Sequence, residues 1–311
     1  MDEILRKHVA AFKAALAGQA VECSPEKPIN YGCQVVCRRG PEEIKVNFYH
    51  GKKGLSTVIQ GKAGPLKDLL EGLAHGAAAS AAGQARPGGD TILLPAGTTT
   101  WMGCDESGKG DVFGPLCCAA CQVTTETADL LRRAGVCDSK ALTDKAILTL
   151  ADLIRQTLPD RWAVRIVMPG EYNSLYEMHR QKHENLNHLL GSLHAQNIRV
   201  LLSKHECPCI IVDKFGKEEY VLSKLGGLEK THRIIQVPKG ERDTAVAAAS
   251  ILAREAFVVG MDDLRARYGM TFPKGAYLGI SQAIRQVQDH FGTTALAEVG
   301  KLNFKNFDFL R

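Results

Sequence analysis

This sequence lacks the features of a membrane or secreted protein. No apolar run approaches the roughly 18 residues that a membrane-spanning helix needs. Met1 leads directly into a charged, helix-like segment instead of the apolar stretch of a signal peptide. No internal repeat is visible either. We therefore expect a cytoplasmic protein that does not act on a membrane.

The ten cysteines indicate neither a disulfide framework nor a zinc site. They lie in or beside apolar runs. Cys118 and Cys121 match a C-x-x-C pattern, but no second C-x-x-C and no nearby histidine completes a zinc set. Cys207 and Cys209 likewise fit an apolar strand better than a metal site. We expect reduced, buried thiols, as in a cytosolic protein.

What the sequence does have is the composition of an ordinary globular protein. Hydrophobic residues make up 45% and charged residues 23% of the 311 positions, so a sizeable core can form. A chain of this length is expected to hold two domains. The net charge of +5 and the isoelectric point of about 8.6 are compatible with a polyanionic partner but do not identify one.

Residues 1–75 are expected to form one α+β domain. Apolar residues recur at helical spacing over 2–16, and the run 64–73 also predicts a helix. Strands are predicted over 20–23, 31–38, 43–50 and 55–60. Gly51–Gly54 is a hairpin signal between the last two strands. This order suits a curved antiparallel sheet backed by helices.

The remaining chain, residues 91–311, is expected to be an α/β domain. Small residues and a Pro-Gly-Gly end predict a flexible linker over 76–90 in front of it. Strands are predicted over 99–104, 116–123, 162–168, 209–212 and 233–237. Helices are predicted over 144–157, 184–205, 244–268 and 281–290. Two early hairpin strands followed by strand–helix alternation imply a mixed sheet with helices on its faces.

The most informative segment is Gly103–Pro115. Within it, Asp105 and Glu106 end an apolar run, and a Gly-Lys-Gly loop follows at once. Adjacent carboxylates repel, so a fold that holds them together usually needs a cation between them. Oxygen ligands favour a hard ion such as Mg²⁺ or Mn²⁺, and glycines let the backbone approach a phosphate or sugar closely. Together these features indicate phosphodiester chemistry; a solvated polar turn is the alternative.

Further polar residues can join this pair. Asp213 ends an apolar strand, and the carboxyl ends of strands are the usual site of chemistry in α/β folds. Glu241 and Asp243 precede a small-residue helix, where Asp243 fits the role of helix cap and Glu241 is less explained by capping. The polar turn at 138–140 suits either phosphate binding or a helix cap.

At these positions the chain resembles a known family, bacterial ribonuclease HIII, a relative of ribonuclease HII. Asp-Glu-Ser-Gly-Lys-Gly-Asp-x-Phe-Gly-Pro at 105–115 is similar to the opening motif of that family. The resemblance continues in order through Asp138–Lys140, Tyr172-Asn173, Asn185–Asn187, Leu193-His194, Val212–Phe215, Ala245–Arg254, Pro273–Ala276 and Lys301–Asn306. Ile29–Gly32 and Val46–Lys52 resemble the TATA-binding-protein-like domain that is typical of ribonuclease HIII and absent from most HII proteins.

The resemblance implies a ribonuclease H-like fold, a mixed sheet with flanking helices, behind a TATA-binding-protein-like α+β domain. It also implies endonucleolytic cleavage of the RNA strand of RNA–DNA hybrids, leaving 3′-OH and 5′-phosphate ends, by a monomer that uses two Mg²⁺ or Mn²⁺ ions. The implied metal-binding and catalytic acids are Asp105, Glu106, Asp213 and Glu241. The candidate substrate contacts in the catalytic domain are Ser107, Gly108, Lys109, Gly110, Ser139 and Lys140. In the N-terminal domain, basic residues that include Arg38 and Lys52 cluster on or near the strands, where they either bind the hybrid or form a solvated face.

Two departures and two alternatives remain open. The loop after Glu241 is short, which leaves Asp243 as a less favoured substitute for the fourth acid. Asn303 stands where many relatives have His, so a phosphate or core contact is in doubt there. One alternative function is ribonuclease HII-like cleavage at single ribonucleotides in duplex DNA; the other is a non-catalytic nucleic-acid-binding protein.

Overall fold

The computed structural model describes most of the chain and divides it into two compact units. The described residues are 3–16, 21–51, 54–61, 64, 66–67, 69–70, 94–139 and 142–310. The units are residues 1–90 and residues 91–311. The predicted linker at 76–90, together with Lys52 and Lys140, lies outside the described residues.

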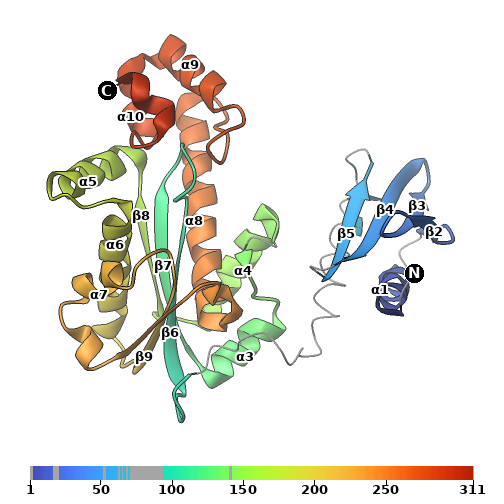
Figure 1. Ribbon diagram of the computed structural model, residues 1–311, viewed down its shortest axis with the longest axis horizontal. Helices are drawn as coiled ribbons and strands as arrows, with labels where there is room; N and C mark the ends of the chain where they lie inside the picture. The colour runs from blue at the N-terminus through green and yellow to red at the C-terminus, as the bar shows by residue number, and fades with distance from the viewer. Residues whose placement is uncertain are drawn as a thin grey trace. The chain divides into compact units, whose positions relative to one another are not determined.

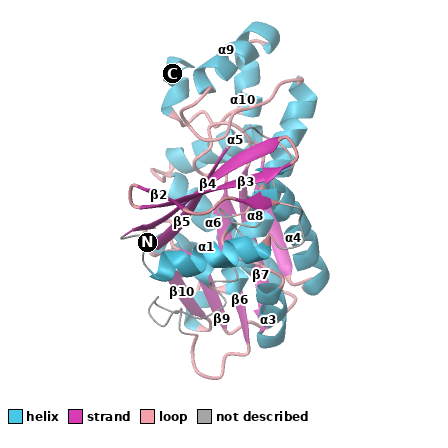
Figure 2. Ribbon diagram, turned by 90° about the vertical axis from the view of Figure 1, so that its right-hand side faces the viewer, coloured by secondary structure: helices cyan, strands magenta, loops and turns pink. Residues whose placement is uncertain are grey.

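The N-terminal unit is an antiparallel sheet packed against a helix (Figure 1; Figure 2). Its elements are α1 (Glu3–Ala15), β1 (Glu22–Cys23), β2 (Lys27–Ile29), β3 (Gly32–Arg39), β4 (Glu42–Gly51) and β5 (Gly54–Gln60). The strand order is β1-β3-β4-β5, with β2 also paired to β3. Phe12 of α1 meets Phe48 of β4 with ring centroids 5.1 Å apart, at the centre of the core. Half of the predicted helix at 64–73 lies outside the described residues, but Leu66 and Leu70 are buried in this core.

The second unit is built on a mixed sheet of five strands. They are β6 (Thr100–Ser107), β7 (Leu116–Thr124), β8 (Trp162–Val167), β9 (Cys209–Asp213) and β10 (Arg233–Val237). Their spatial order is β10-β9-β6-β7-β8, so that β6 is central. β7 is antiparallel to both β6 and β8, whereas β9 is parallel to both β6 and β10. The predicted mixed sheet is therefore confirmed.

Helices cover both faces of this sheet (Figure 1). The helices of this unit are α3 (Thr125–Arg133), α4 (Asp144–Thr157), α5 (Pro169–Gln181), α6 (Leu186–Leu202), α7 (Glu219–Leu225), α8 (Thr244–Tyr268), α9 (Ile280–Phe291) and α10 (Leu296–Val299); α9 and α10 lie beyond the end of the sheet (Figure 1). α3, α4 and α8 pack on one face with a core that includes Ile211 and Phe257. α6 and α7 pack on the other face over Ile210 and Val212. Alternate residues of β9 thus enter opposite cores, as the pleat of a strand requires.

Helix α8 corrects the expectation that no segment is long and apolar enough to cross a membrane. It spans Thr244–Tyr268 and contains an 18-residue window of mean hydropathy 1.5. Of that window, 78% is buried inside the structure, where α8 packs on β6 and β7. Its apolar character is accounted for by this position, since a helix enclosed by its own protein is apolar all round.

The strand that carries the two adjacent acids is longer than predicted. β6 continues to Ser107 rather than ending at Cys104, because the ladder with β7 extends through the pair Ser107–Cys117. Asp105 and Glu106 therefore lie within a central strand and not in the loop after it. Acids are poor strand formers, so local propensity does not predict this extension.

The expectation of ten buried thiols is wrong at two positions. All ten cysteines are free, and eight are buried. Cys137 is exposed and Cys23 is half-buried. Both lie near the ends of apolar segments, where a side chain can reach the surface.

Candidate active site

Two carboxylates of β6 form the centre of the site. Successive side chains of a strand point to opposite faces, so Asp105 faces α8 and Glu106 faces α6. Asp105 is 9% exposed and is hydrogen-bonded to Ser250 of α8. Glu106 contacts His194 of α6, with 3.2 Å between Oε2 and Nε2.

Asp213 is brought to the same place by strand pairing. β9 runs parallel to β6 with Val212 opposite Cys104, so Asp213 at the end of β9 is next to the acids of β6. The backbone N–H of Gly240 donates to Asp213 Oδ1 at 2.7 Å, which fixes the orientation of this carboxylate. The predicted meeting of the 105–106 pair with Asp213 is thus what the structure shows.

These carboxylates line a hollow of about 480 Å³. The sequence-predicted residues around it are Asp105, Glu106, Ser107, Gly108, Lys109, Gly110, Ser139 and Asp213. The hollow is completed by Asp111, Leu142, Ser250 and Arg254. Glu241 is one residue from Gly240, but its side chain is not among those that line the hollow.

Burial and the repulsion between neighbouring carboxylates raise the pKa of Asp105. Removal from water, followed by the negative charge of Glu106, raises the pKa of the Asp105 carboxyl well above its usual range. The backbone N–H of Glu106, which donates to Asp105 Oδ1 at 2.7 Å, opposes this rise. A cation in the hollow would relieve the same repulsion.

The carboxylate set fits a hard divalent cation in its chemistry, since it offers oxygen ligands from neighbouring strands. The carboxylates, however, are not drawn together around one point as the ligands of a bound metal ion are. Within the described ranges, no three His, Cys, Asp or Glu side chains are gathered closely enough to hold a metal ion. Like-charged carboxylates that repel one another are expected to stand apart in this way.

Glu106 is held on both of its oxygens. Its Oε2 faces His194, and its Oε1 lies 3.8 Å from Lys109 Nζ. Phe215 fills the space between these two partners, because the His194 ring stacks on it at 5.4 Å and Lys109 Nζ lies 5.1 Å from its ring centroid. Lys109 Nζ also donates to the carbonyl of Phe215 at 3.3 Å. The ammonium group of Lys109 is therefore placed at the wall of the hollow.

Asp243, the possible substitute for Glu241, has a different role in the structure. It is the N-cap of α8 and accepts from the backbone N–H groups of Ala245 and Val246 at 2.8 and 3.2 Å. Both of its oxygens also accept from Trp101 Nε1, at 3.1 and 3.0 Å. Burial raises the pKa of Asp243, and these hydrogen bonds oppose the rise. Both carboxylate oxygens of Asp243 therefore accept hydrogen bonds from other groups of the protein.

The loop after β6 is held by the C-terminal segment. Gly108 has a φ of +86°, and a Cβ there would lie 2.1 Å from the carbonyl oxygen of Pro115, so only glycine fits. Lys301 is fully buried, and its Nζ donates to the carbonyls of Asp111 and Gly114 at 2.8 and 2.6 Å. The Gly275 N–H donates to Asp111 Oδ1 at 2.7 Å. Residues far apart in sequence therefore shape one wall of the hollow.

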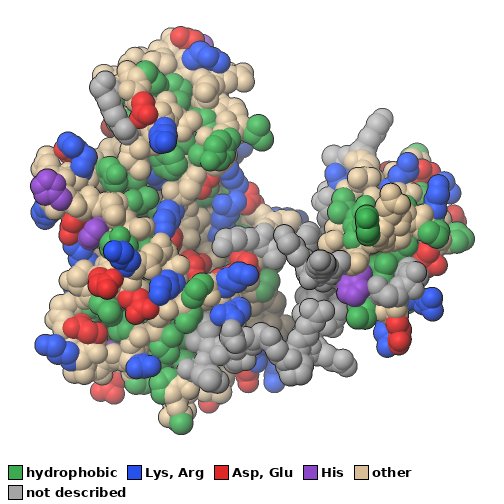
Figure 3. Space-filling view, viewed as in Figure 1, with side chains coloured by type: hydrophobic (Ala, Val, Ile, Leu, Met, Phe, Trp, Pro, Cys, Tyr) green, Lys and Arg blue, Asp and Glu red, His purple; other side chains and the backbone are tan. Residues whose placement is uncertain are grey.

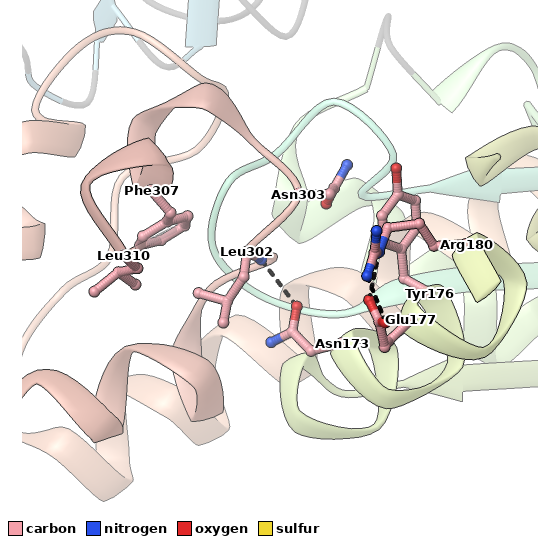
Figure 4. A pocket seen from close by; sticks show the side chains of 8 residues that line it. All are labelled: Asn173, Tyr176, Glu177, Arg180, Leu302, Asn303, Phe307 and Leu310. Carbon is pink, nitrogen blue, oxygen red and sulfur yellow. Dashed lines mark hydrogen bonds and ion pairs between the residues drawn. The ribbon is translucent and has the colours of Figure 1, made fainter. Parts of the chain in front are cut away.

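Asn303 lies in a second hollow, of about 650 Å³, beside α5 (Figure 4). It accepts a hydrogen bond from the hydroxyl of Tyr172 at 3.0 Å. Close by, Asn173 accepts from the backbone N–H of Leu302 at 2.9 Å. Asn303 therefore provides a core contact at the position where a ring was expected.

The predicted basic cluster of the N-terminal unit is partly neutralised. Arg38 is exposed and pairs with Glu43, with 2.8 Å between nitrogen and oxygen, and Arg39 lies 3.7 Å from Glu42. Figure 3 shows basic and acidic side chains mixed on the visible face of this unit. Arg38 is not part of the hollow at the acids, which is lined by residues of the second unit alone.

His194, Ser250 and Arg254 were not singled out as site residues from the sequence. Ser250 Oγ lies 2.7 Å from Ser139 Oγ, and Arg254 is bonded to Asp144 at 3.4 Å. Ser250 and Arg254 are four residues apart on α8 and hence on one face. The spacing of Ser250 and Arg254 can therefore predict from the sequence that they share one face of α8. The position of His194 at the site depends on how α6 packs on the sheet, which the sequence pattern does not encode.

Comparisons with known proteins agree with this geometry. The Ribonuclease HII family model matches residues 102–307. Ribonuclease HIII of Protochlamydia amoebophila (strain UWE25) is 38% identical over 210 residues, 68% of this chain and 68% of that protein. Ribonuclease HIII of Chlamydia pneumoniae is 42% identical over 212 residues, 67% of this chain and 68% of that protein. The crystal structure of Bst-RNase HIII in complex with Mn²⁺ matches with a TM-score of 0.62 and 26% identity, covering 97% of this chain and 94% of that one.

The mixed sheet, with its acids on neighbouring central strands, defines the ribonuclease H-like class. Within that class, the chain belongs to the ribonuclease HIII family and is an endoribonuclease. The structural match extends over nearly the whole chain, so it includes the N-terminal unit, whose fold is that of a TATA-binding-protein-like domain. The fold class predicted from the sequence is confirmed.

Proposed function

We propose that this protein hydrolyses the RNA strand of RNA–DNA hybrids at the hollow formed by the acids of β6 and β9. The observation that supports it most directly is the convergence of Asp105, Glu106 and Asp213 on one hollow beside a glycine loop. Water attacks the phosphorus in line and the bond to the 3′ oxygen breaks, which leaves 3′-OH and 5′-phosphate ends.

The acids of this hollow are the proposed metal ligands. Asp105, Glu106, Asp213 and Glu241 would hold two Mg²⁺ or Mn²⁺ ions, which activate water and stabilise the leaving oxygen when bound. A similar ribonuclease HIII has been crystallised with Mn²⁺, which supports this choice of ion. Glu241 stays a prediction, since its side chain is not among those that line the hollow.

Other residues of the hollow are proposed to bind and orient the RNA strand. The backbone at Gly110 is open to a ribose, because a Cβ there would meet nothing within 4 Å. A protein distinguishes RNA from DNA by contacts to the 2′-OH, and this backbone together with Ser107 and Glu106 is placed to make them. Lys109 and Ser139 are proposed phosphate contacts, and such contacts position the strand without reading its sequence.

The N-terminal unit is proposed to bind the hybrid and to deliver it to the acids. Arg38 and Lys52 are its candidate contacts, although Arg38 must exchange its pairing with Glu43 for a phosphate.

We further propose that the protein acts as a monomer in the cytoplasm. The ten free thiols support location in a reducing compartment. Light scattering of the purified chain, which measures its mass in solution, tests whether it is a monomer.

Cleavage of three defined duplexes tests the proposal. A uniform RNA–DNA hybrid, a DNA duplex with a single ribonucleotide and a DNA duplex are incubated with Mg²⁺, with Mn²⁺ or with a chelator. We expect metal-dependent cleavage of the hybrid and none of plain DNA. Cleavage of the single-ribonucleotide duplex alone would indicate an HII-like enzyme. Binding of the hybrid without cleavage in either metal would leave only the non-catalytic alternative.

A further inference from the structure

Two cysteines of the N-terminal unit lie opposite each other on adjacent strands. Cys23 of β1 pairs with Cys37 of β3 in the antiparallel ladder. Their sulfur atoms are 3.4 Å apart. Among the described residues, which include all ten cysteines, theirs is the one pair of cysteine sulfurs in hydrogen-bonding contact.

The flanking hydrogen bonds fix this register. The N–H of Ser24 donates to the carbonyl of Val36 at 2.8 Å, and the N–H of Val36 donates to Ser24 Oγ at 3.0 Å. Cys23 and Cys37 are therefore a non-hydrogen-bonded pair, whose Cα atoms are about 4.5 Å apart in an antiparallel ladder. A disulfide needs a Cα separation of roughly 4.4–6.8 Å, so the backbone already satisfies it.

We propose that Cys23 and Cys37 are an oxidative modification site, at which a hydroperoxide converts the two thiols into an intramolecular disulfide. This site is independent of the cleavage chemistry, since it lies in the N-terminal unit. Its product ties the two-residue strand β1 covalently to β3, where the neighbouring residue is the candidate substrate contact Arg38.

The two sulfurs have different surroundings, and these set their roles. Cys23 is half-buried and therefore partly accessible to a small oxidant, whereas Cys37 is fully buried. Burial raises the pKa of the Cys37 thiol, which keeps it protonated and protected from direct attack. Cys23 as thiolate attacks the hydroperoxide, giving a sulfenic acid and an alcohol, or water from hydrogen peroxide. The Cys37 thiol then gives up its proton as its sulfur attacks the Cys23 sulfur; the S–O bond of the sulfenic acid breaks, its hydroxyl leaves with that proton as water, and the disulfide forms.

The remaining cysteines near the surface or on the same strand serve as controls. Cys33 is on the same face of β3 as Cys37 but four residues away, and it is opposite Phe48 of β4 rather than another cysteine. Cys137 is exposed, and its sulfur contacts only a backbone carbonyl at 3.9 Å, that of Asp138. Within the described part of the chain, neither thiol has another sulfur in hydrogen-bonding contact.

Peptide mapping of the oxidised full-length protein tests the proposal. The chain is treated with a small excess of hydrogen peroxide, the remaining thiols are alkylated, and the protein is cut after glutamate without reductant. Cleavage at Glu22, Glu26 and Glu42 separates the two cysteines into peptides 23–26 and 27–42. We expect these peptides to be joined, lighter by two hydrogen atoms than their sum, and released by dithiothreitol. Cys33→Ser and Cys137→Ser should retain the linked pair, and Cys23→Ser should lose it.

Other outcomes would overturn the site. Linkage through Cys33, detected by fragmentation of the 27–42 peptide, would show that the register is different in solution. Dimers joined through Cys137 with no internal link, or sulfinic acid on Cys23 with Cys37 still alkylated, would show that Cys37 does not resolve the oxidised sulfur. The result on the wild-type chain decides the matter even if a serine variant folds poorly.

Discussion

At the scale of single residues, Asp105 is the acid of the proposed metal site whose pKa is raised by burial and by the charge of Glu106. It is buried next to Glu106 on the central strand, and its carboxyl group faces the hollow. Asp105→Asn keeps the shape but removes the charge that a divalent ion needs. We expect the cleavage rate to fall below about a tenth of wild type, since electrostatic contributions in active sites are commonly of this size or larger. Fluorescence anisotropy should show that hybrid binding survives; a variant that still cleaves at near wild-type rate would place Asp105 outside the site.

Glu241 and Asp243 can be separated by paired substitutions. Asp243→Asn keeps an oxygen that can cap α8 but loses one of the two acceptors of Trp101, which should cost no more than about 1 kcal/mol in the free energy of unfolding. Glu241→Gln should leave stability unchanged and abolish cleavage if Glu241 is the fourth ligand. Thermal melts and cleavage rates of both variants are measured in parallel. An inactive Asp243→Asn beside an active Glu241→Gln would reverse the assignment.

Lys301 predicts a pH dependence of stability. Burial lowers its pKa from 10.5 to about 7, so the folded protein binds fewer protons than the unfolded chain between these values. The contribution of Lys301 to the free energy of unfolding therefore rises with pH from about 7 to about 10.5 and is flat below that window. Lys301→Met removes this slope and adds a constant loss, because three backbone carbonyls, those of Asp111, Phe113 and Gly114, lose their donor.

Chemical denaturation of the wild type and of Lys301→Met at several pH values measures this difference. Groups other than Lys301 titrate in both proteins, so their contributions cancel. A difference in the free energy of unfolding that does not change with pH would mean that Lys301 keeps its proton in the folded state throughout.

At the scale of elements, the packing of α8 on β6 leaves no room for a side chain at Gly103. A Cβ there would lie 2.1 Å from the backbone nitrogen of Val246 and 2.2 Å from the carbonyl carbon of Ala245. Gly103→Ala must separate the first turn of α8 from the strand. We expect a loss of about 1–3 kcal/mol in the free energy of unfolding, typical of overpacking.

Gly110→Ala is the matched control for stability, since a Cβ at this position would meet nothing within 4 Å. Urea denaturation compares the two variants with wild type. Equal stability of Gly103→Ala and wild type would show that the contact between α8 and β6 is looser than the structure has it.

Periodicity in the sequence predicts most elements but not their ends at the site. The apolar runs of β7 and β9 and the long helix α8 are visible, because burial on both sides makes each continuously apolar. α3 escapes prediction since its buried positions are only Ala128 and Leu131 among polar neighbours. The contact of His194 with Glu106 joins residues 88 positions apart, which no local pattern encodes.

At the scale of the whole molecule, each unit has its own core. The N-terminal core lies within residues 5–70, whereas the cores of the second unit use residues from 94 onward. A fragment beginning at Thr91 should therefore fold and keep its metal-dependent chemistry. We expect a strongly raised KM for the hybrid, because a tethered binding unit increases the effective concentration of substrate.

Salt provides the control for this prediction. Each phosphate contact that is lost makes the decrease of affinity with salt less steep, so the fragment should show a shallower slope than the full chain. Hybrid binding by the fragment and the full chain is measured over a series of salt concentrations. Equal affinity at every salt concentration would remove the delivery role from the N-terminal unit.

Asp105 and Glu106 have hydrogen-bond partners on opposite faces of the sheet in the second unit. Asp105 is bonded to Ser250 of α8, and Glu106 contacts His194 of α6. The spacing of the two carboxylates therefore depends on the alignment of these two helix layers across the sheet. A small displacement of either helix layer along the sheet would change the distance between the two carboxylates without requiring any strand pair to break. On warming, we expect cleavage activity to be lost while the secondary structure is still intact. The temperature of half-inactivation should therefore lie below the temperature of unfolding.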